Sequence, residues 1–147
     1  MKKLNKKNGF TLIELIIVMV ILGIMAAVAV PRYLDSISNA EQSAEDAMIN
    51  SIKSGLSQYA NNSLYESGRA EWPTNPFDAL SEKPSGYSTS ETDAAVDGEW
   101  TFSDGRITHQ RADNSRYSWD YYAGVQNGDE AETGTLDGRT IIEQELD

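Results

Sequence analysis

Residues 10–30 read FTLIELIIVMVILGIMAAVAV, an apolar run of 21 residues that contains one acidic side chain, Glu14. As an α-helix this run extends about 31 Å, close to the roughly 30 Å hydrocarbon thickness of a bilayer. Its many β-branched residues also suit a strand, but strands run only about 4–8 residues, so the length favours a helix. The run therefore predicts a transmembrane helix. Because it is apolar on all sides, it must lie in lipid or against other helices.

The residues before this run predict its orientation. Lys2, Lys3, Lys6 and Lys7 precede it, and no acidic residue lies among the first nine positions. Positively charged flanks stay in the cytoplasm, so the C-terminal part is expected on the far side of the membrane. A secretory signal is an alternative, with residues 27–29 (Ala-Val-Ala) as its cleavage site, but its apolar region is usually about 7–15 residues long. A plain signal anchor is a second alternative.

Composition excludes several classes of function. The chain has 147 residues, enough for one domain, and a formal net charge of −11, which argues against a nucleic-acid surface. It has no cysteine, and its single histidine, His109, excludes multi-histidine metal sites. We expect His109 to be a satisfied strand residue. No Walker, Rossmann or nucleophile-elbow motif occurs, so the sequence predicts no enzyme.

Glu14 is the unexpected residue of the apolar run. A carboxylate in the membrane costs about 2.5–3.5 kcal/mol on insertion scales, and such residues are usually paired and functional. The available cations are the lysines at the N-terminus, or a new α-amino group if the chain is cut before Phe10. Phe10 and Glu14 are four residues apart and share a helix face, so a new amine could meet this carboxylate on the same helix or a neighbouring one.

Residues 6–14, KKNGFTLIE, followed by the apolar run, resemble the class III signal peptide of type IV pilins and type II secretion pseudopilins, the N-methyl-phenylalanine type. The resemblance implies cleavage between Gly9 and Phe10 by a prepilin peptidase, which also N-methylates Phe10. It implies that Glu14 pairs with the Phe10 amine of an adjacent subunit during assembly. The transmembrane helix would then leave the membrane and form the core of a filament.

The resemblance continues through Gly23 and Pro31 to Tyr33. Glycine and proline both weaken a helix, so Gly23 and Pro31 are expected to provide helix flexibility, although Pro31 could simply mark the membrane boundary. The implied partners are further copies of the chain, minor pilins and an inner-membrane assembly platform. The implied localisation is the inner membrane with the head exported, then a pilus on the cell surface or a periplasmic pseudopilus.

After residue 31 the pattern becomes amphipathic. Apolar residues recur at helical spacing, and polar ones fall between them, which predicts a helix that continues to about Leu64. The predicted apolar stripe is Tyr33, Ile37, Ala40, Ala44, Met48, Ile52, Leu56 and Tyr59; the positions predicted to lie off it are Glu41, Glu45, Asp46, Asn50 and Lys53.

The C-terminal part predicts an irregular loop and a small sheet. Residues 63–98 are rich in turn formers, with Trp72, Pro73 and Phe77 as expected anchors. Asp104-Gly105 predicts a hairpin between residues 99–103 and 106–110, in which Trp100, Phe102, Ile107 and His109 share a face. A further strand is predicted at 116–123, with Tyr117, Trp119 and Tyr121 on one face. A short fourth hairpin or strand pair is predicted around Asp137-Gly138, between Leu136 and residues 140–142.

These patterns predict an α+β, pilin-like fold: a long N-terminal α-helix, with a transmembrane first half and an amphipathic second half, packed on a small antiparallel β-sheet. The predicted segments are a cleaved leader (1–9), a transmembrane and filament-core helix (10–30), an amphipathic stalk (31–64) and a globular head (65–147).

No cofactor is predicted, with one open point. The acidic residues Asp129, Glu130 and Glu132, or Asp120 with Asp137, could bind Ca²⁺, as the C-terminal loop of major pseudopilins does. No EF-hand spacing supports such a site, so a solvated acidic face is favoured.

The predicted function is that of a structural subunit of a type IV pilus, assembled by helix packing. The first alternative is the major pseudopilin of a type II secretion system. An alternative of another class is a membrane-tethered periplasmic binding or enzymatic domain that does not polymerise.

Overall fold

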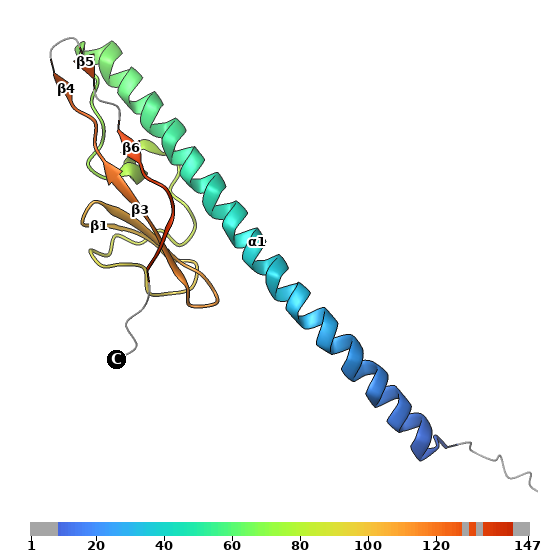
Figure 1. Cartoon of the computed structure of the whole chain (residues 1–147). Coiled ribbons are helices and arrows are strands. Elements are labelled where there is room, and N and C mark those ends of the chain that lie inside the picture. Colours follow the sequence, from blue (N-terminus) through green and yellow to red (C-terminus); the bar gives the residue numbers. More distant parts are fainter. Residues whose placement is uncertain (1–8, 128–129, 132–133, 143–147) are drawn as a thin grey trace, which may run out of the picture. The chain divides into compact units, whose positions relative to one another are not determined.

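The computed structural model describes residues 9–127, 130–131 and 134–142 (Figure 1). The described residues form two compact units, residues 9–42 and the residues from Ser43 onward. The elements are α1 (Leu12–Ser67), the 3-10 helix η1 (Pro76–Ala79), β1 (Trp100–Ser103), β2 (Arg106–Gln110), β3 (Arg116–Tyr122), β4 (Gln126–Asn127), β5 (Glu130–Ala131), β6 (Thr135–Leu136) and β7 (Thr140–Ile142).

Helix α1 confirms the predicted long helix with shifted ends. It begins at Leu12 rather than Phe10 and continues past Leu64 to Ser67. Gly68 ends it in the left-handed conformation (φ 74°), and its N–H donates to the carbonyl of Leu64 at 2.9 Å. This glycine stop is a common helix terminus, because glycine adopts positive φ without strain.

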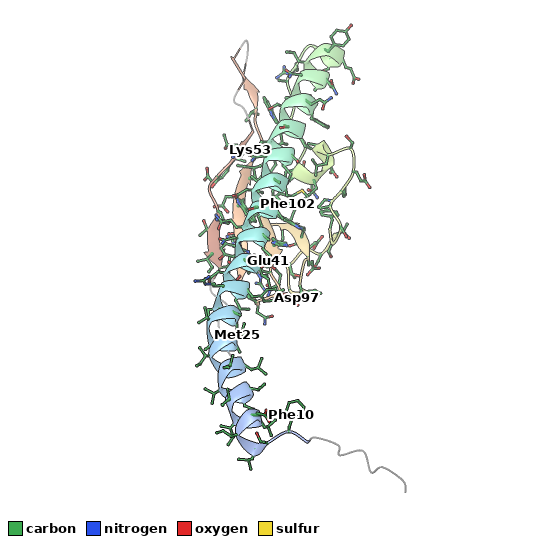
Figure 2. The ribbon with its side chains drawn as sticks, turned by 90° about the vertical axis from the view of Figure 1, so that its right-hand side faces the viewer. Phe10, Met25, Glu41, Lys53, Asp97 and Phe102 are labelled. Atoms are coloured by element: carbon green, nitrogen blue, oxygen red, sulfur yellow. The ribbon has the colours of Figure 1, made fainter. Side chains whose placement is uncertain are left out.

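The first unit is helix with no core of its own. None of residues 9–42 is buried, and α1 runs through Gly23 and Pro31 without interruption. Figure 2 shows side chains projecting from all sides of this part of the helix, with Phe10 at its N-terminal end. This helix is long and apolar enough to cross a membrane.

In the second unit, α1 packs on the sheet along a face that differs from the predicted stripe. Its buried residues are Glu45, Ile49, Ile52, Leu56 and Ala60. Ile52 and Leu56 were predicted correctly. Of the other predicted stripe residues, Met48 is half-buried, whereas Tyr33, Ile37, Ala40, Ala44 and Tyr59 are exposed. The prediction that Glu45 lies off the buried face was wrong, because ionic partners on the sheet compensate its burial.

The sheet has the order β1-β2-β3-β6, and β7 also pairs with β3, all antiparallel. The predicted hairpin is confirmed: Asp104 (φ 54°) and Gly105 (φ 78°) form the turn between β1 and β2. Two positive φ values are the signature of a type I′ turn. Trp100 pairs with His109 and Phe102 with Ile107, which places these four side chains on one face as predicted.

The strands predicted at Leu136 and at residues 140–142 are confirmed as β6 and β7, but the predicted hairpin around Asp137-Gly138 was wrong. Strands β6 and β7 do not pair with each other, and both pair with β3. Residues 137–139 lie opposite residues 119–120 of β3, so the outer strand carries one extra residue, which is a β-bulge. The short ladder of β4 with β5 was not predicted.

The core lies between α1 and the sheet (Figure 1). Ile49, Ile52 and Leu56 of the helix pack against the buried aromatic and aliphatic residues Phe77, Trp100, Ile107, Trp119 and Tyr121. Two predicted anchors are confirmed, because Phe77 is fully buried and the carbonyl of the buried Pro73 accepts a 2.8 Å bond from the Tyr121 hydroxyl. The third, Trp72, is half-buried and packs against this core.

The segment before β1 covers the opposite face of the hairpin. Ala94 is fully buried, and its N–H donates to the hydroxyl of Thr108 at 2.8 Å. The hydroxyls of Thr108 and Thr101 bond to each other at 2.7 Å, so both buried threonines are satisfied. The start predicted for the loop at residue 63 was wrong, because α1 continues to Ser67. From Gly68 to Gly98 the segment is irregular apart from η1, and it helps to bury the hairpin on its second face.

Candidate processing and assembly site

Gly9 and Phe10 lie before the first turn of α1 and are freely accessible. The Phe10 side chain is 91% exposed, and a Cβ added at Gly9 would meet nothing within 4 Å. Both residues precede the helix, which begins at Leu12. The peptide bond between them is therefore an open backbone segment that a protease can reach without unwinding the helix.

Thr11 and Glu14 hydrogen-bond to each other across the first turn of the helix. The Thr11 N–H donates to the Glu14 carboxylate at 2.8 Å, and the Thr11 hydroxyl donates to the same oxygen at 2.7 Å. The Glu14 N–H in turn donates to the Thr11 hydroxyl oxygen at 3.3 Å. This reciprocal arrangement is a capping box, which satisfies N–H groups that a helix start leaves unpaired.

The capping box adds a local role for Glu14 that our sequence interpretation missed. The spacing Thr-x-x-Glu is its signal, and it was visible in the sequence. The bonded Thr11 N–H belongs to the peptide group that follows Phe10. The carboxylate is thus held one peptide unit from the position where cleavage after Gly9 would create an amine.

Apart from Thr11 and Glu14, residues 10–30 of the first unit offer only apolar surface. Between Phe10 and Val30, Glu14 is the one charged side chain, and the large apolar residues expose 45–91% of their surface. Such a surface is unstable in water and needs lipid or other apolar helices as a neighbour. This part of α1 can therefore anchor the chain or associate with further helices.

Gly23 and Pro31 both lie inside α1. A Cβ added at Gly23 would meet nothing within 4 Å, so packing within the chain does not require glycine there. Pro31 has no N–H to donate to the preceding turn, which leaves a carbonyl without its helical partner. Their role in helix flexibility stays a prediction.

A second polar cluster, unforeseen from the sequence, surrounds Glu45. Its carboxylate accepts bonds from Arg111 at 2.7 and 2.5 Å and from Arg139 at 3.0 Å. The Nδ1 atom of His109 lies 2.9 Å from Glu45 Oε1. Arg111 and Arg139 also lie over the ring of Tyr117, at 4.0 and 5.3 Å from its centroid.

The ionised form of Glu45 is stabilised by these partners. Burial of the Glu45 carboxyl by itself raises its pKa, but the bonds from Arg111, His109 and Arg139 outweigh burial and lower the pKa to about 2. The carboxylate is therefore charged at neutral pH and joins α1 to β2, to the residue after β2, and to the bulge. His109 also stacks on Trp100 with ring centroids 4.2 Å apart, which agrees with its predicted place as a satisfied strand residue.

The Ca²⁺ candidates gain no support from the geometry. Asp120 pairs with Arg106 at 3.4 Å, and Asp137 contributes its backbone N–H to the Asp120 carbonyl. Asp129 and Glu132 lie outside the described residues, as does the side chain of Glu130. Within the described residues, no group of three or more histidine, cysteine or acidic side chains is arranged to hold a metal ion.

Comparison with known proteins gives one matching family model, the prokaryotic N-terminal methylation motif, over residues 4–30. The type IV narrow pilus major component of Thermus thermophilus is 39% identical over 103 residues, which cover 70% of this chain and 77% of that protein. The type II secretion system core protein G of Vibrio cholerae is 37% identical over 83 residues, covering 52% and 57% of the two chains.

A fimbrial protein of Neisseria meningitidis is 42% identical over 69 residues, or 47% of this chain. The match spans only 37% of the length of that relative. No solved structure matches the chain.

Proposed function

Since the chain belongs to the family of type IV pilins and type II secretion pseudopilins, we propose that it is the structural subunit of a type IV pilus. The observation that carries this proposal is the long stretch of α1 in which no residue before Glu45 is buried, headed by an accessible Gly9–Phe10 bond. The apolar part of this stretch, up to Val30, can be stabilised by lipid or by other apolar helices. It therefore suits a subunit that passes from membrane to filament.

The proposed sequence of events begins with cleavage between Gly9 and Phe10 by a prepilin peptidase and N-methylation of Phe10. Cleavage removes four lysines and no acidic residue, so the formal charge falls from −11 to −15. Glu14 then neutralises the new Phe10 amine of an adjacent subunit. Helix packing with non-closing contacts yields a filament rather than a closed oligomer.

The proposed partners are further copies of the chain, minor pilins, the peptidase and an inner-membrane assembly platform. Before assembly the chain lies in the inner membrane with its head exported. Its role is structural rather than enzymatic.

A second candidate function is that of a major pseudopilin, and the Vibrio cholerae relative favours it. Both functions use the same processing and the same helix packing. They differ in where the filament lies, since a pilus extends from the cell surface and a pseudopilus stays in the periplasm.

Intact-mass analysis of the membrane and filament fractions tests the proposal. We expect a chain that begins at Phe10 and carries one methyl group. A chain that begins after Ala29 would indicate ordinary secretion and contradict the proposal. An uncut chain held in the membrane would support a tethered domain that does not polymerise.

The same preparation distinguishes the two filaments. Shearing intact cells should release the mature chain in filaments if they are surface pili. Recovery of the mature chain only after the outer envelope is opened would favour the pseudopilus.

A further inference from the structure

The segment from Gly134 to Ile142 forms the outer strand of the sheet, yet it contributes no buried residue. Leu136, Arg139 and Ile142 are half-buried, and Thr135, Thr140 and Ile141 are exposed. Strands β1, β2 and β3, by contrast, each contain buried residues. Apolar burial therefore holds this segment only at its start, where Gly134 packs closely on the Trp72 side chain and Leu136 contacts the core.

Arg139 supplies the strongest side-chain attachment of this segment. Its guanidinium lies 3.0 Å from one oxygen of the buried Glu45 and 3.9 Å from the carboxylate of Asp46, both on α1. It also lies over the ring of Tyr117 on β3. Charge-assisted bonds of this kind are stronger than neutral ones, and here one partner is fully desolvated.

The β-bulge places Arg139 on the face of the sheet that packs on α1. Tyr121 pairs with Leu136, and Tyr117 pairs with Ile141, so Leu136 and Ile141 share the face of the sheet that packs on α1. Residues five apart in a regular strand would point to opposite faces. The extra residue at 137–139 shifts the alternation of side chains by one position. As a result, Leu136 and Ile141 lie on the same face, and Arg139 points towards α1.

The strand that this segment covers is the longest in the sheet. Strand β3 has seven residues, and the outer segment pairs with it at residues 116–118 and again at 121–122. Without the segment, β3 would present an open edge beside Tyr117, Trp119 and Tyr121. Long apolar edges invite pairing with other chains, whereas short strands, bulges and inward-pointing charges blunt an edge.

We propose that residues 134–142 act as a strap, fastened to α1 by Arg139, that covers the edge of β3 and opens as one unit while the rest of the head stays folded. The strap has every property of a blunted edge: two short strands, a bulge and a charge that points inward. Its closure prevents a second copy of the chain from pairing with β3.

Hydrogen exchange of the full chain in detergent micelles tests the strap. We expect Arg139→Gln to raise the exchange of amides in 134–142 about tenfold, the factor that corresponds to the loss of one charge-assisted hydrogen bond. Exchange in β1 and β2 should stay as in the wild type. The matched control is Arg106→Gln, which breaks the exposed pair with Asp120 on the same sheet and should leave the strap unchanged.

An engineered disulfide between β3 and β6 provides the second part of the experiment. Tyr122 and Thr135 are register partners, both are exposed, and the chain has no cysteine of its own. Tyr122→Cys with Thr135→Cys in the Arg139→Gln background should return exchange in 134–142 to the wild-type rate when oxidised. Reduction should restore the fast rate.

Two results would overturn the proposal. Unchanged exchange in 134–142 after Arg139→Gln would show that Arg139 does not fasten the strap. Faster exchange throughout the head, not corrected by the engineered disulfide when oxidised, would show that Arg139 supports the whole fold rather than one opening unit. Neither result bears on filament formation, so the proposed function is tested separately.

Discussion

Substitution of Glu14 tests its proposed role in assembly separately from membrane anchoring. Replacing it with leucine makes the helix more apolar, so insertion should be unharmed or improved. If Glu14 pairs with the Phe10 amine of an adjacent subunit as proposed, the same change leaves that amine without its counter-charge. Removing one partner of a buried pair costs about 3–5 kcal/mol. We expect Glu14→Leu to accumulate in the membrane without filaments, measured as the ratio of sheared to membrane-bound subunit.

Two further variants separate the effect of the Glu14 charge on assembly from the effect of its helix-capping hydrogen bonds. Glu14→Gln keeps an acceptor for Thr11 but brings no charge, so its filament yield should be partly reduced. Thr11→Val removes the capping hydroxyl, which costs about 1 kcal/mol, and leaves the carboxylate, so filaments should persist. Wild-type filament yield in Glu14→Leu would end the assembly role of this residue.

The ionic contacts of Glu45 are expected to stabilise the fold of the head. Glu45→Gln keeps the side-chain volume but leaves Arg111 and Arg139 facing a neutral amide, with an expected loss of about 3–5 kcal/mol in the free energy of unfolding. Asp78→Asn is the matched control, because its pair with Lys83 is about half exposed and should contribute less than about 1 kcal/mol. Urea unfolding followed by tryptophan fluorescence measures both, and equal losses would contradict the role of Glu45.

The same carboxylate makes stability depend on pH in a definite window. Its pKa is lowered from 4.5 to about 2 in the folded head, so its contribution is complete above about pH 4.5 and is lost as the pH falls towards 2. We expect the difference in unfolding free energy between wild type and Glu45→Gln to shrink as the pH falls below 4.5. A difference that persists unchanged at pH 2.5 would exclude titration of Glu45 as its source.

Glu14 and Glu45 show which individual residues can be identified as important from the sequence and which cannot. Glu14 stands out because a lone charge in an apolar run is costly, and its neighbours are local in sequence. Glu45 looked like one more exposed charge on an amphipathic helix, since its partners His109, Arg111 and Arg139 come from distant segments. Apolar periodicity cannot report burial that depends on ionic pairing across a fold.

At the scale of elements, the packing of η1 on α1 requires a glycine at position 55. A Cβ added there would lie 2.7 Å from the carbonyl oxygen of Ala79, a backbone atom that cannot move without shifting η1. Gly55→Ala should therefore destabilise the head by about 1–3 kcal/mol, although alanine is the better helix former. Ser54→Ala, on the exposed side of the same turn, is the control and should change stability by less than about 0.5 kcal/mol in the same urea experiment.

The two Asp-Gly pairs explain why one hairpin was predicted correctly and the other was not. Asp104-Gly105 joins runs of four and five residues that are long enough to pair with each other. Asp137-Gly138 lies between runs of only two and three residues, and β3 offers both of them a free edge. The local turn signal is identical in the two cases, so the outcome depends on tertiary pairing that the sequence pattern does not contain.

For the whole molecule, the division into an apolar helix and a head predicts that the head folds without the first unit. Every buried residue in the described part of the chain lies at Glu45 or beyond, so a fragment that begins at Asp35 retains the entire core and the ion cluster. It also loses the apolar surface of residues 10–34, which the described part of the chain leaves exposed. We expect this fragment to be soluble, monomeric by sedimentation velocity, and cooperative in thermal unfolding.

A shorter fragment that begins at Met48 tests whether the ion cluster around Glu45 contributes to the stability of the head. It keeps Ile49, Ile52 and Leu56 but lacks Glu45, so Arg111 and Arg139 lose their shared buried carboxylate. Because uncompensated buried charge is costly, the shorter fragment should unfold at a markedly lower temperature than the fragment that begins at Asp35. Aggregation of the longer fragment would mean that the α1 face in the head requires a second chain to cover it. Equal stability of the two fragments would mean that the ion cluster contributes nothing to the stability of the fold.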